Sequence, residues 1–236
     1  FTLGEKAMIE IFYEDQSVIV TVKPPGIDSQ ARHSFEPDMV SEIRKYLSKL
    51  STSKSTANKP PYVGVVHRLD KPVGGVMVYA RNQKAAAQLS RQITDGTLKK
   101  TYLAAVCGKP VDNVENYVDY LRKDGKQNFS QIVDKSVDGS KRAELSYQVL
   151  DSRVVENQPV SLVKIQLHTG RHHQIRVQFA GHGTPLWGDG KYGEKVSGRQ
   201  LALWSWKLSF IHPVSQKVME FTAAPKGGIL KQFLEG

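Results

Sequence analysis

The 236-residue sequence has a single cysteine, Cys107, and no apolar run that approaches the ~18 residues of a membrane span. One cysteine excludes an internal disulfide bond and any zinc site built from several thiolates, and it suits a reducing cytosol. Cys107 lies among apolar strand residues and is expected to be an inert buried thiol. No signal-like segment opens the chain, so we expect a cytoplasmic protein without membrane contact. The chain begins at Phe1 rather than Met, and we expect that a few residues precede it.

Positive charge is in excess. Lys and Arg number 33 against 23 for Asp and Glu, which gives a formal net charge of +10 at pH 7 and a pI near 9.6. A solvated basic surface would account for this excess, but basic residues spread along the whole chain favour a polyanionic partner such as nucleic acid. The 39% hydrophobic and 24% charged content is that of an ordinary folded domain.

Alternation and periodicity predict many strands and a few flanking helices, without an internal repeat. Two apolar runs flank the segment HRLDK (67–71), and each is expected to form a buried strand. No composition break marks a boundary, so we predict one α+β domain over 1–236 with a mixed, mainly antiparallel sheet. Further strands are expected at 9–15, 17–23, 100–108, 143–151, 160–168, 201–210 and 217–224, helices at 38–50, 82–96, 171–181 and 227–235, and loops or hairpins at 51–61 and 111–142.

Two familiar site types fail on this sequence. Gly183 and Gly188 have the spacing of a phosphate-binding loop, but Asp189 replaces the lysine that such a loop needs. His172 and His173 are adjacent, so on a helix their rings would point about 100° apart and would not share a metal ion. No metal site is therefore predicted.

Asp70 is the best placed residue for acid–base or nucleophilic chemistry. It follows an apolar run, lies at a Gly-rich turn where a backbone can approach a ligand, and has Arg68 and Lys71 beside it. The alternative is that Asp70 makes a turn hydrogen bond and Arg68 a surface salt bridge. This segment alone does not decide between the two.

Two other segments favour the functional interpretation. Arg171 lies where an apolar strand gives way to a predicted helix, and a cation at the start of a helix is unfavourable unless an anion faces it. Tyr102 lies in a predicted strand beside two lysines. A carboxylate, an arginine and a tyrosine at strand ends or edges of a basic protein suit chemistry on a stacked nucleic acid base.

Taken in order, the motifs resemble those of the RluA-type pseudouridine synthases. The similarity begins at about Ile9 and continues to the C-terminus. The motifs are HRLDK (67–71) followed by Gly-Gly, KTY (100–102), LHTGRxHQIR (167–176), GDxxYG (188–193) and a late strand that ends in IHP (211–213). Five motifs in register make the resemblance specific.

The resemblance implies an RNA uridine isomerase without a cofactor, which breaks the N1–C1′ glycosidic bond, rotates the uracil and rejoins it through C5. It implies an RNA-binding cleft across the middle of the sheet. By position in the motifs, Asp70 matches the catalytic aspartate, Tyr102 the tyrosine that packs on the target base, and Arg171 the basic residue paired with the aspartate. Leu203 matches an apolar wall of the pocket. We expect further substrate contacts from His67, Arg68, Lys100, His173 and Arg176.

These roles make chemical sense. Attack at C1′, or removal of the 2′ proton, needs an ionised carboxylate, which a neighbouring guanidinium favours. The tyrosine ring offers a stacking face, and its hydroxyl is a candidate for removing the C5 proton. The target uridine must leave any helix, so base flipping is expected. The expected partner is structured RNA, either rRNA or tRNA, and the expected state is a monomer.

The sequence departs from the family pattern at three places: Val73-Gly74-Gly75 replaces Thr-Ser-Gly, His172 replaces a Thr, and Trp204 stands where a His is common. No small S4-type RNA-binding module precedes the pattern, so target choice is expected to rest on the catalytic domain or on a lost extension. Two other functions stay open. An inactive RNA-binding protein would keep the fold, and a nucleoside hydrolase would need Asp189 as a second carboxylate near Asp70.

Overall fold

The computed structural model describes residues 9–31, 36–50 and 60–235, and the chain divides into two compact units. Unit 1 comprises residues 1–98 and 207–223, and unit 2 comprises residues 99–206 and 224–236. The boundary falls inside strand β10 (Leu203–Ile211). The single catalytic domain expected over 1–236 stays a prediction. Most of the loop expected at 51–61 lies outside the described residues.

Unit 1 is built on a short antiparallel sheet. Strands β1 (Glu10–Glu14) and β2 (Val18–Lys23) lie where strands were predicted and form an antiparallel pair, and β2 also pairs with β4 (Gly74–Ala80). Every residue of β2 and β4 is buried, which explains their continuous apolar runs. Strand β11 (Val218–Thr222) pairs with the end of β10.

The helices of unit 1 match their predicted positions. Helix α1 (Met39–Leu50) buries one apolar face, and α2 (Gln83–Thr94) packs against β3 and β4. Asn82 caps α2, because its side chain accepts a hydrogen bond of 2.9 Å from the Ala85 backbone N–H.

The apolar run before HRLDK does not form the full strand that was predicted. Strand β3 contains only Gly64 and Val65, and residues 66–73 are irregular or turns. A side-chain acceptor replaces the backbone carbonyl of a paired strand here, because the Val78 N–H of β4 donates to His67 Nε2 at 3.1 Å. Val63 is buried and Val65 and Val66 are half-buried, although only Gly64 and Val65 pair with β4.

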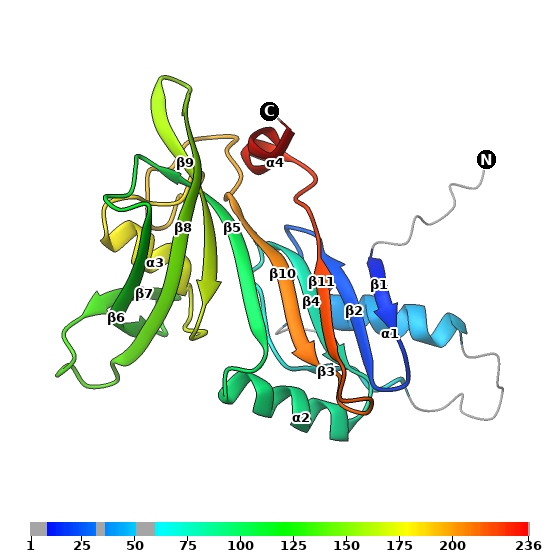
Figure 1. Cartoon of the computed structure of the whole chain (residues 1–236). Helices are drawn as coiled ribbons and strands as arrows, with labels where there is room; N and C mark the ends of the chain where they lie inside the picture. Colours follow the sequence, from blue (N-terminus) through cyan, green and yellow to red (C-terminus); the bar gives the residue numbers. More distant parts are fainter. Residues whose placement is uncertain (1–8, 32–35, 51–59, 236) are drawn as a thin grey trace. The chain divides into compact units, whose positions relative to one another are not determined.

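Unit 2 contains a five-stranded antiparallel sheet in the order β5–β9–β8–β6–β7 (Figure 1). The region 111–142, expected to hold loops or hairpins, contains the β6–β7 hairpin and the start of β8. The strands are β5 (Lys99–Cys107), β6 (Val114–Asp124), β7 (Phe129–Val133), β8 (Lys141–Val155) and β9 (Gln158–Leu167).

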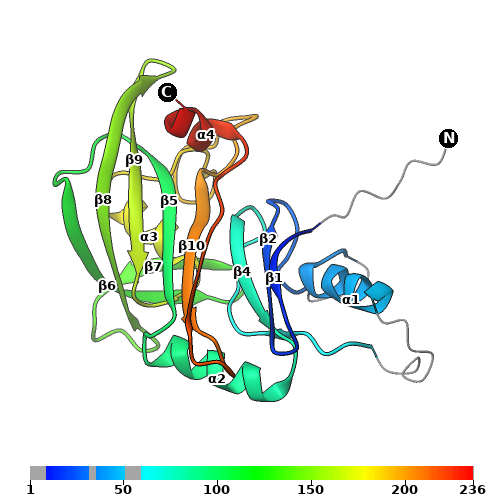
Figure 2. The ribbon, with the colours of Figure 1, turned by 45° about the vertical axis from the view of Figure 1, so that its right-hand side comes forward.

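One face of this sheet packs against helix α3 (Gln174–Gly181), as Figure 2 also shows. Phe179 of α3 lies 5.3 Å, centroid to centroid, from the Tyr117 ring and from the Tyr147 ring. Directly paired residues of neighbouring strands share a face. Tyr147 pairs with Ile165, which pairs with Tyr102, so Tyr102 belongs to the face that α3 covers.

Helix α3 begins three residues later than predicted. His173 has a left-handed backbone with a φ of 53°, which the interior of a right-handed helix does not accommodate. Helix α4 (Gly228–Glu235) forms where the sequence predicts it and packs against β5. The α+β class is thus confirmed. Among the described residues, no helix is long and apolar enough to cross a membrane.

A buried lysine connects two turns of unit 1. Lys23 is fully buried at the end of β2, and its ammonium donates to the carbonyl oxygens of Pro24 at 3.1 Å, Ile27 at 2.6 Å and Lys71 at 3.1 Å. Burial lowers the pKa of Lys23 to about 8, and the nearby carboxylates of Asp28 and Asp70 act in the opposite direction. Three acceptors satisfy the three N–H groups of the ammonium.

Replacing this lysine by an apolar residue should destabilise the protein. In Lys23→Met the carbonyls of Pro24 and Ile27 lose the Lys23 donor, whereas the Lys71 carbonyl keeps the Gly26 N–H, and an unsatisfied buried acceptor costs roughly 1–3 kcal/mol. We expect a loss of about 3 kcal/mol in the free energy of unfolding, measured with urea. The exposed Lys84→Met is the matched control and should change stability by less than about 0.5 kcal/mol.

The same pair of proteins should differ in pH dependence. The folded chain binds the Lys23 proton more weakly than the unfolded chain, whose lysine has the ordinary pKa of 10.5. The free energy of unfolding of the wild type should therefore rise between pH 8 and 10.5 relative to Lys23→Met. A parallel course of the two curves over this window would contradict the proposed burial of the charge.

Candidate active site

The turn that carries Asp70 is held in place within unit 1. The Ser29 hydroxyl donates to the Leu69 carbonyl and accepts from the Leu69 N–H, both at 3.0 Å. The Val73 N–H donates to the Asp70 carbonyl at 2.9 Å, and the Gly26 N–H donates to the Lys71 carbonyl at 2.8 Å. Two chain segments thus fix the backbone on both sides of the carboxylate.

Side chains of this turn alternate between the interior and the surface. His67 and Leu69 are buried, Arg68 is exposed, and Asp70 is half-buried. Lys71 points to an exposed pair of carboxylates, with its ammonium 2.8 Å from Glu36 and 3.7 Å from Asp28. Arg68 therefore lies on the surface and Asp70 at its edge, whereas the contact of His67 with Val78 is internal.

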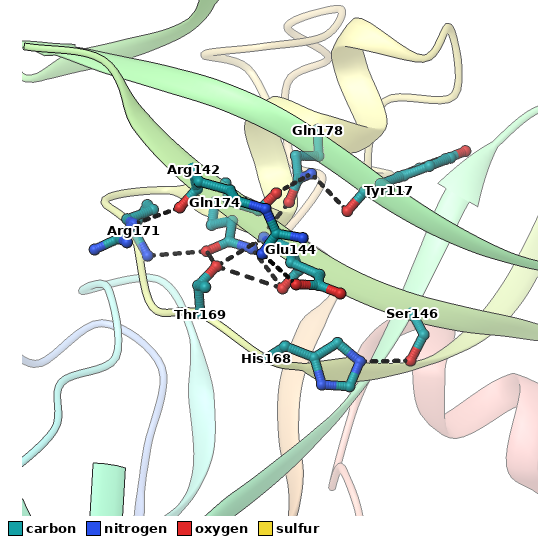
Figure 3. Close-up of polar contacts among 10 residues, drawn as sticks. Tyr117, Arg142, Glu144, Ser146, His168, Thr169, Arg171, Gln174 and Gln178 are labelled. Atoms are coloured by element: carbon teal, nitrogen blue, oxygen red, sulfur yellow. Dashed lines mark hydrogen bonds and ion pairs between the residues drawn. The ribbon is translucent and has the colours of Figure 1, made fainter. Parts of the chain in front are cut away.

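The second candidate turn, residues 168–171, lies in unit 2 and is locked to strand β8 (Figure 3). The Glu144 N–H donates to the Thr169 hydroxyl at 2.8 Å, and the Glu144 carbonyl accepts from the backbone N–H groups of His168 and Thr169. The Gln174 amide donates to the same carbonyl at 3.1 Å. Its oxygen accepts from the Thr169 hydroxyl at 2.7 Å and from the Arg171 N–H at 2.9 Å.

These hydrogen bonds present Arg171 on the surface. Its Nε donates to the Arg142 carbonyl at 2.8 Å, and the side chain is otherwise exposed. Within the described part of unit 2, no carboxylate lies at ion-pair distance from this guanidinium. Arg171 and Asp70 belong to different units, so their pairing stays a prediction.

Strand β5 supplies two further candidates. Tyr102 is 5% exposed and shares a strand face with Lys100, two residues before it. Burial lowers the pKa of Lys100. Leu203 is buried at the start of β10, next to Ala202, whose carbonyl accepts a hydrogen bond from Ala105 of β5. Tyr102, Lys100 and Leu203 therefore belong to unit 2, as Arg171 does.

The two adjacent histidines do not lie on a helix, and the expected 100° between their rings is wrong. Their rings stack with centroids 3.7 Å apart, because His173 has a left-handed backbone ahead of α3. His172 Nδ1 lies 2.8 Å from the Ser130 hydroxyl, and its Nε2 lies 3.0 Å from Asn128 Oδ1. The histidine that replaces the family's Thr thus connects this turn to the β6–β7 hairpin.

The neighbouring His173 is neutral. Burial, with the positive charges of Arg176 and Lys191, lowers its pKa to about 3. Its Nδ1 lies 2.7 Å from the Tyr192 hydroxyl. Among the described residues, no group of three or more His, Cys, Asp or Glu is arranged to hold a metal ion.

Arg176 and Asp189 form a buried ion pair. Arg176 Nε and Nη2 donate to the two Asp189 oxygens at 2.8 and 2.7 Å, and the guanidinium lies 5.2 Å from the Tyr192 ring centroid. Burial alone would raise the pKa of Asp189, but Arg176 and the N–H groups of Lys191 and Tyr192 lower it overall. Asp189 is 1% exposed and committed to these contacts, which speaks against its use as a second carboxylate in hydrolysis.

Contacts within unit 2 account for the glycine and the tyrosine of the GDxxYG motif. Gly188 has a φ of 74°, and a Cβ there would lie 2.2 Å from the Gln200 carbonyl oxygen, so only glycine fits. Tyr192 accepts a hydrogen bond from the Ser130 N–H at 2.9 Å. The contacts that Arg176 and His173 make with this motif are internal to unit 2, and their predicted contacts with RNA stay predictions.

Sequence reasoning missed the supporting roles of four residues. Lys23 ends an apolar strand and precedes a Pro-Pro-Gly turn. A lysine at the end of a continuously buried strand was the available sign that its ammonium is buried. Gln174 and Thr169 belong to the recognised motif, but their hydrogen bonds with Glu144 needed the structure. Glu144 acts through its backbone, so no sequence signal marks it.

Comparisons with known proteins point to one family. A family model described as RNA pseudouridylate synthase matches residues 17–181. An uncharacterized RNA pseudouridine synthase of Bacillus subtilis, YlyB, is 34% identical over 224 residues, which cover 94% of this chain and 70% of that protein. Ribosomal large subunit pseudouridine synthase D of Zymomonas mobilis is 29% identical over 226 residues, covering 91% and 68%.

A solved structure shares the fold. Human RNA pseudouridylate synthase domain containing 1 superposes with a TM-score of 0.73 over 95% of this chain and 86% of its own, at 21% sequence identity. Because the family model covers most of the chain and the motifs lie at the two fixed turns, the chain belongs to the RNA pseudouridine synthases of the RluA type, which are isomerases that convert uridine to pseudouridine in RNA.

Proposed function

We propose that this chain isomerises uridine in the RNA of the large ribosomal subunit, as a monomer in the cytoplasm. Relatives from Zymomonas mobilis and Neisseria meningitidis, the latter 31% identical over 235 residues, are named ribosomal large subunit pseudouridine synthase D. The chain spans 68% and 59% of these two proteins. The net charge of +10 supports a polyanionic substrate. A structured tRNA is the alternative target.

The observation that carries the proposal is the half-buried Asp70 at a turn with fixed backbone. In the proposed reaction its ionised carboxylate attacks C1′ of the flipped uridine or removes the 2′ proton, and the N1–C1′ bond breaks. The positive charge of Lys23 lies near Asp70 and attracts its carboxylate. The uracil then turns and rejoins through C5.

Unit 2 supplies the other proposed groups. Tyr102 stacks on the uracil, and Leu203 forms an apolar wall of its pocket. Arg171, held out by the locked turn, pairs with Asp70. Arg68 is exposed beside Asp70 and suits an RNA phosphate.

The target is identified by mapping pseudouridine in the rRNA and tRNA of cells that lack the protein. We expect a site in large-subunit rRNA to revert to uridine, and to be restored by the intact gene but not by one that encodes Asp70→Asn. Loss of a site in tRNA alone would overturn the choice of rRNA. Free uracil, from purified protein and RNA, would indicate a hydrolase.

Asp70→Asn should abolish isomerisation and leave RNA affinity within about threefold. The amide keeps the shape of the side chain but does not act as a nucleophile or base. The measurement is single-turnover formation of pseudouridine together with RNA binding. Asp138→Asn, an exposed substitution of equal charge change, should keep the wild-type rate. Residual turnover above a hundredth of the wild-type rate in Asp70→Asn would argue against the assignment.

Arg171→Lys should lose more activity than its conserved charge suggests. In Arg171 the Nε donates to the Arg142 carbonyl, and the two terminal nitrogens stay available to bind a carboxylate. Lysine has the same charge but lacks this planar set of donors. We expect at least a tenfold lower single-turnover rate. The exposed Arg122→Lys serves as control. A near-normal rate in Arg171→Lys would make Arg171 a plain phosphate contact.

Tyr102→Phe separates the aromatic ring from its hydroxyl. Stacking is worth roughly 1–3 kcal/mol per base, so Phe should keep RNA affinity and Tyr102→Ala should weaken it. If the hydroxyl helps to remove the C5 proton, Phe should slow a step after bond cleavage by about 10²–10⁴-fold. Single-turnover assays that resolve cleavage from product formation test this. A wild-type rate for Phe with a poor rate for Ala would leave Tyr102 as a stacking platform only.

A further inference from the structure

Lys100 is a largely buried lysine of strand β5 to which the described residues supply no counterion. The residue is 9% exposed, and among the described residues its Nζ has neither a hydrogen bond nor an ion pair. Burial lowers its pKa. Lys23, which is also buried, has three carbonyl acceptors. Because a largely buried charge is costly unless it is paired, the contacts among the described residues give no structural reason for Lys100.

The position of Lys100 connects it to two motifs of the candidate site. It shares a strand face with Tyr102, about 6.6 Å away for two residues of extended strand. Its Nζ lies 3.5 Å from the point where a Cβ of Gly170 would be. Gly170 belongs to the locked turn, directly before Arg171. The ammonium thus lies between the proposed stacking residue and the turn that presents the arginine, both within unit 2.

We propose that Lys100 is a catalytic residue that binds a carbonyl oxygen of the target uracil and stabilises the negative charge of the detached base. This inference rests on the proposed function. When the N1–C1′ bond breaks, its electron pair stays on uracil N1 and is shared with O2 and O4. The bond from C5 to C1′ then forms, C5 loses its proton and N1 gains one, so the atoms of uridine are conserved.

The burial of Lys100 favours the base over a phosphate as its ligand. Phosphate contacts come mostly from exposed side chains, since a phosphate keeps much of its water. A flipped uracil stacked on Tyr102 is flat, loses its water and reaches about as far as the spacing between residues 100 and 102. In such a dry site a preorganised ammonium acts strongly on charge that develops during the reaction. The developing anion also supplies the counterion that the free protein lacks.

The test is Lys100→Met compared with Lys99→Met, its exposed neighbour on the opposite strand face. We expect Lys100→Met to lower the saturating single-turnover rate at least 100-fold, the usual effect of removing one such donor. RNA affinity should stay within about threefold, and the salt dependence of binding should not change. Lys99→Met should keep the wild-type rate. If Lys100→Met fails to fold, Lys100→Gln should show the same loss of rate.

The free energy of unfolding separates a catalytic from a structural role of Lys100. Loss of a structural lysine would lower it. Removing a buried charge that has no partner should leave the free energy of unfolding equal to or above that of the wild type. A clear loss of stability in Lys100→Met would therefore overturn the inference. Weaker binding, a salt slope smaller by about 0.7–0.9 and a normal saturating rate would also overturn it and indicate a phosphate contact.

The inference and the proposed function fail in different ways. A wild-type protein that forms no pseudouridine in any ribosomal or transfer RNA would overturn both. An active wild type, with Asp70→Asn inactive and Lys100→Met fully active, would overturn the role of Lys100 alone.

Discussion

The backbone of Glu144 is the constraint on which the second half of the candidate site depends. A single peptide carbonyl accepts from His168, Thr169 and Gln174, and the N–H of the same residue donates to the Thr169 hydroxyl. These bonds fix a turn that has no regular secondary structure of its own. Arg171 projects from that turn, and α3 begins directly after it. Without this connection to β8, the arginine would sample many positions.

In unit 1 the turn that carries Asp70 is also fixed, but by different groups. This turn is fixed by the Ser29 hydroxyl and by the Lys23 ammonium, so two buried polar side chains do there what backbone groups do in unit 2. In both units a short irregular segment carries a candidate site residue, and buried strands supply the rigid support. This is the usual division between scaffold and site.

Much of the fold was predictable because local pattern and burial agree. The continuous apolar runs of β2 and β4 and the apolar face of α1 identify those elements. The failures occurred where a side chain replaces a backbone partner or where the backbone is left-handed. His67 ends a strand early by accepting the Val78 N–H, and the left-handed backbone of His173 delays α3. Neither effect follows from periodicity.

The sequence motifs identify the candidate site residues, but they do not predict which contacts these residues make. Asp70, Tyr102 and Arg171 are recognisable from their motifs, whereas Asp189 could be judged only from its ion pair with Arg176. Lys100 stands out for the opposite reason, because the described residues give its charge no partner. Sequence alone does not distinguish a lysine that is satisfied, such as Lys23, from one that is not.

The contact between Lys23 and Lys71 also bears on how the chain folds. The two residues are 48 positions apart, so closing this loop has an entropic cost that no local interaction offsets. Lys23 ends β2 and pairs with Gly75 at the start of β4, which brings the ammonium within reach of the Lys71 carbonyl. The turn that carries Asp70 thus gains this contact only after two distant strands have paired. The fixed geometry of this turn is therefore a property of the folded unit, and a growing or partly folded chain lacks this contact.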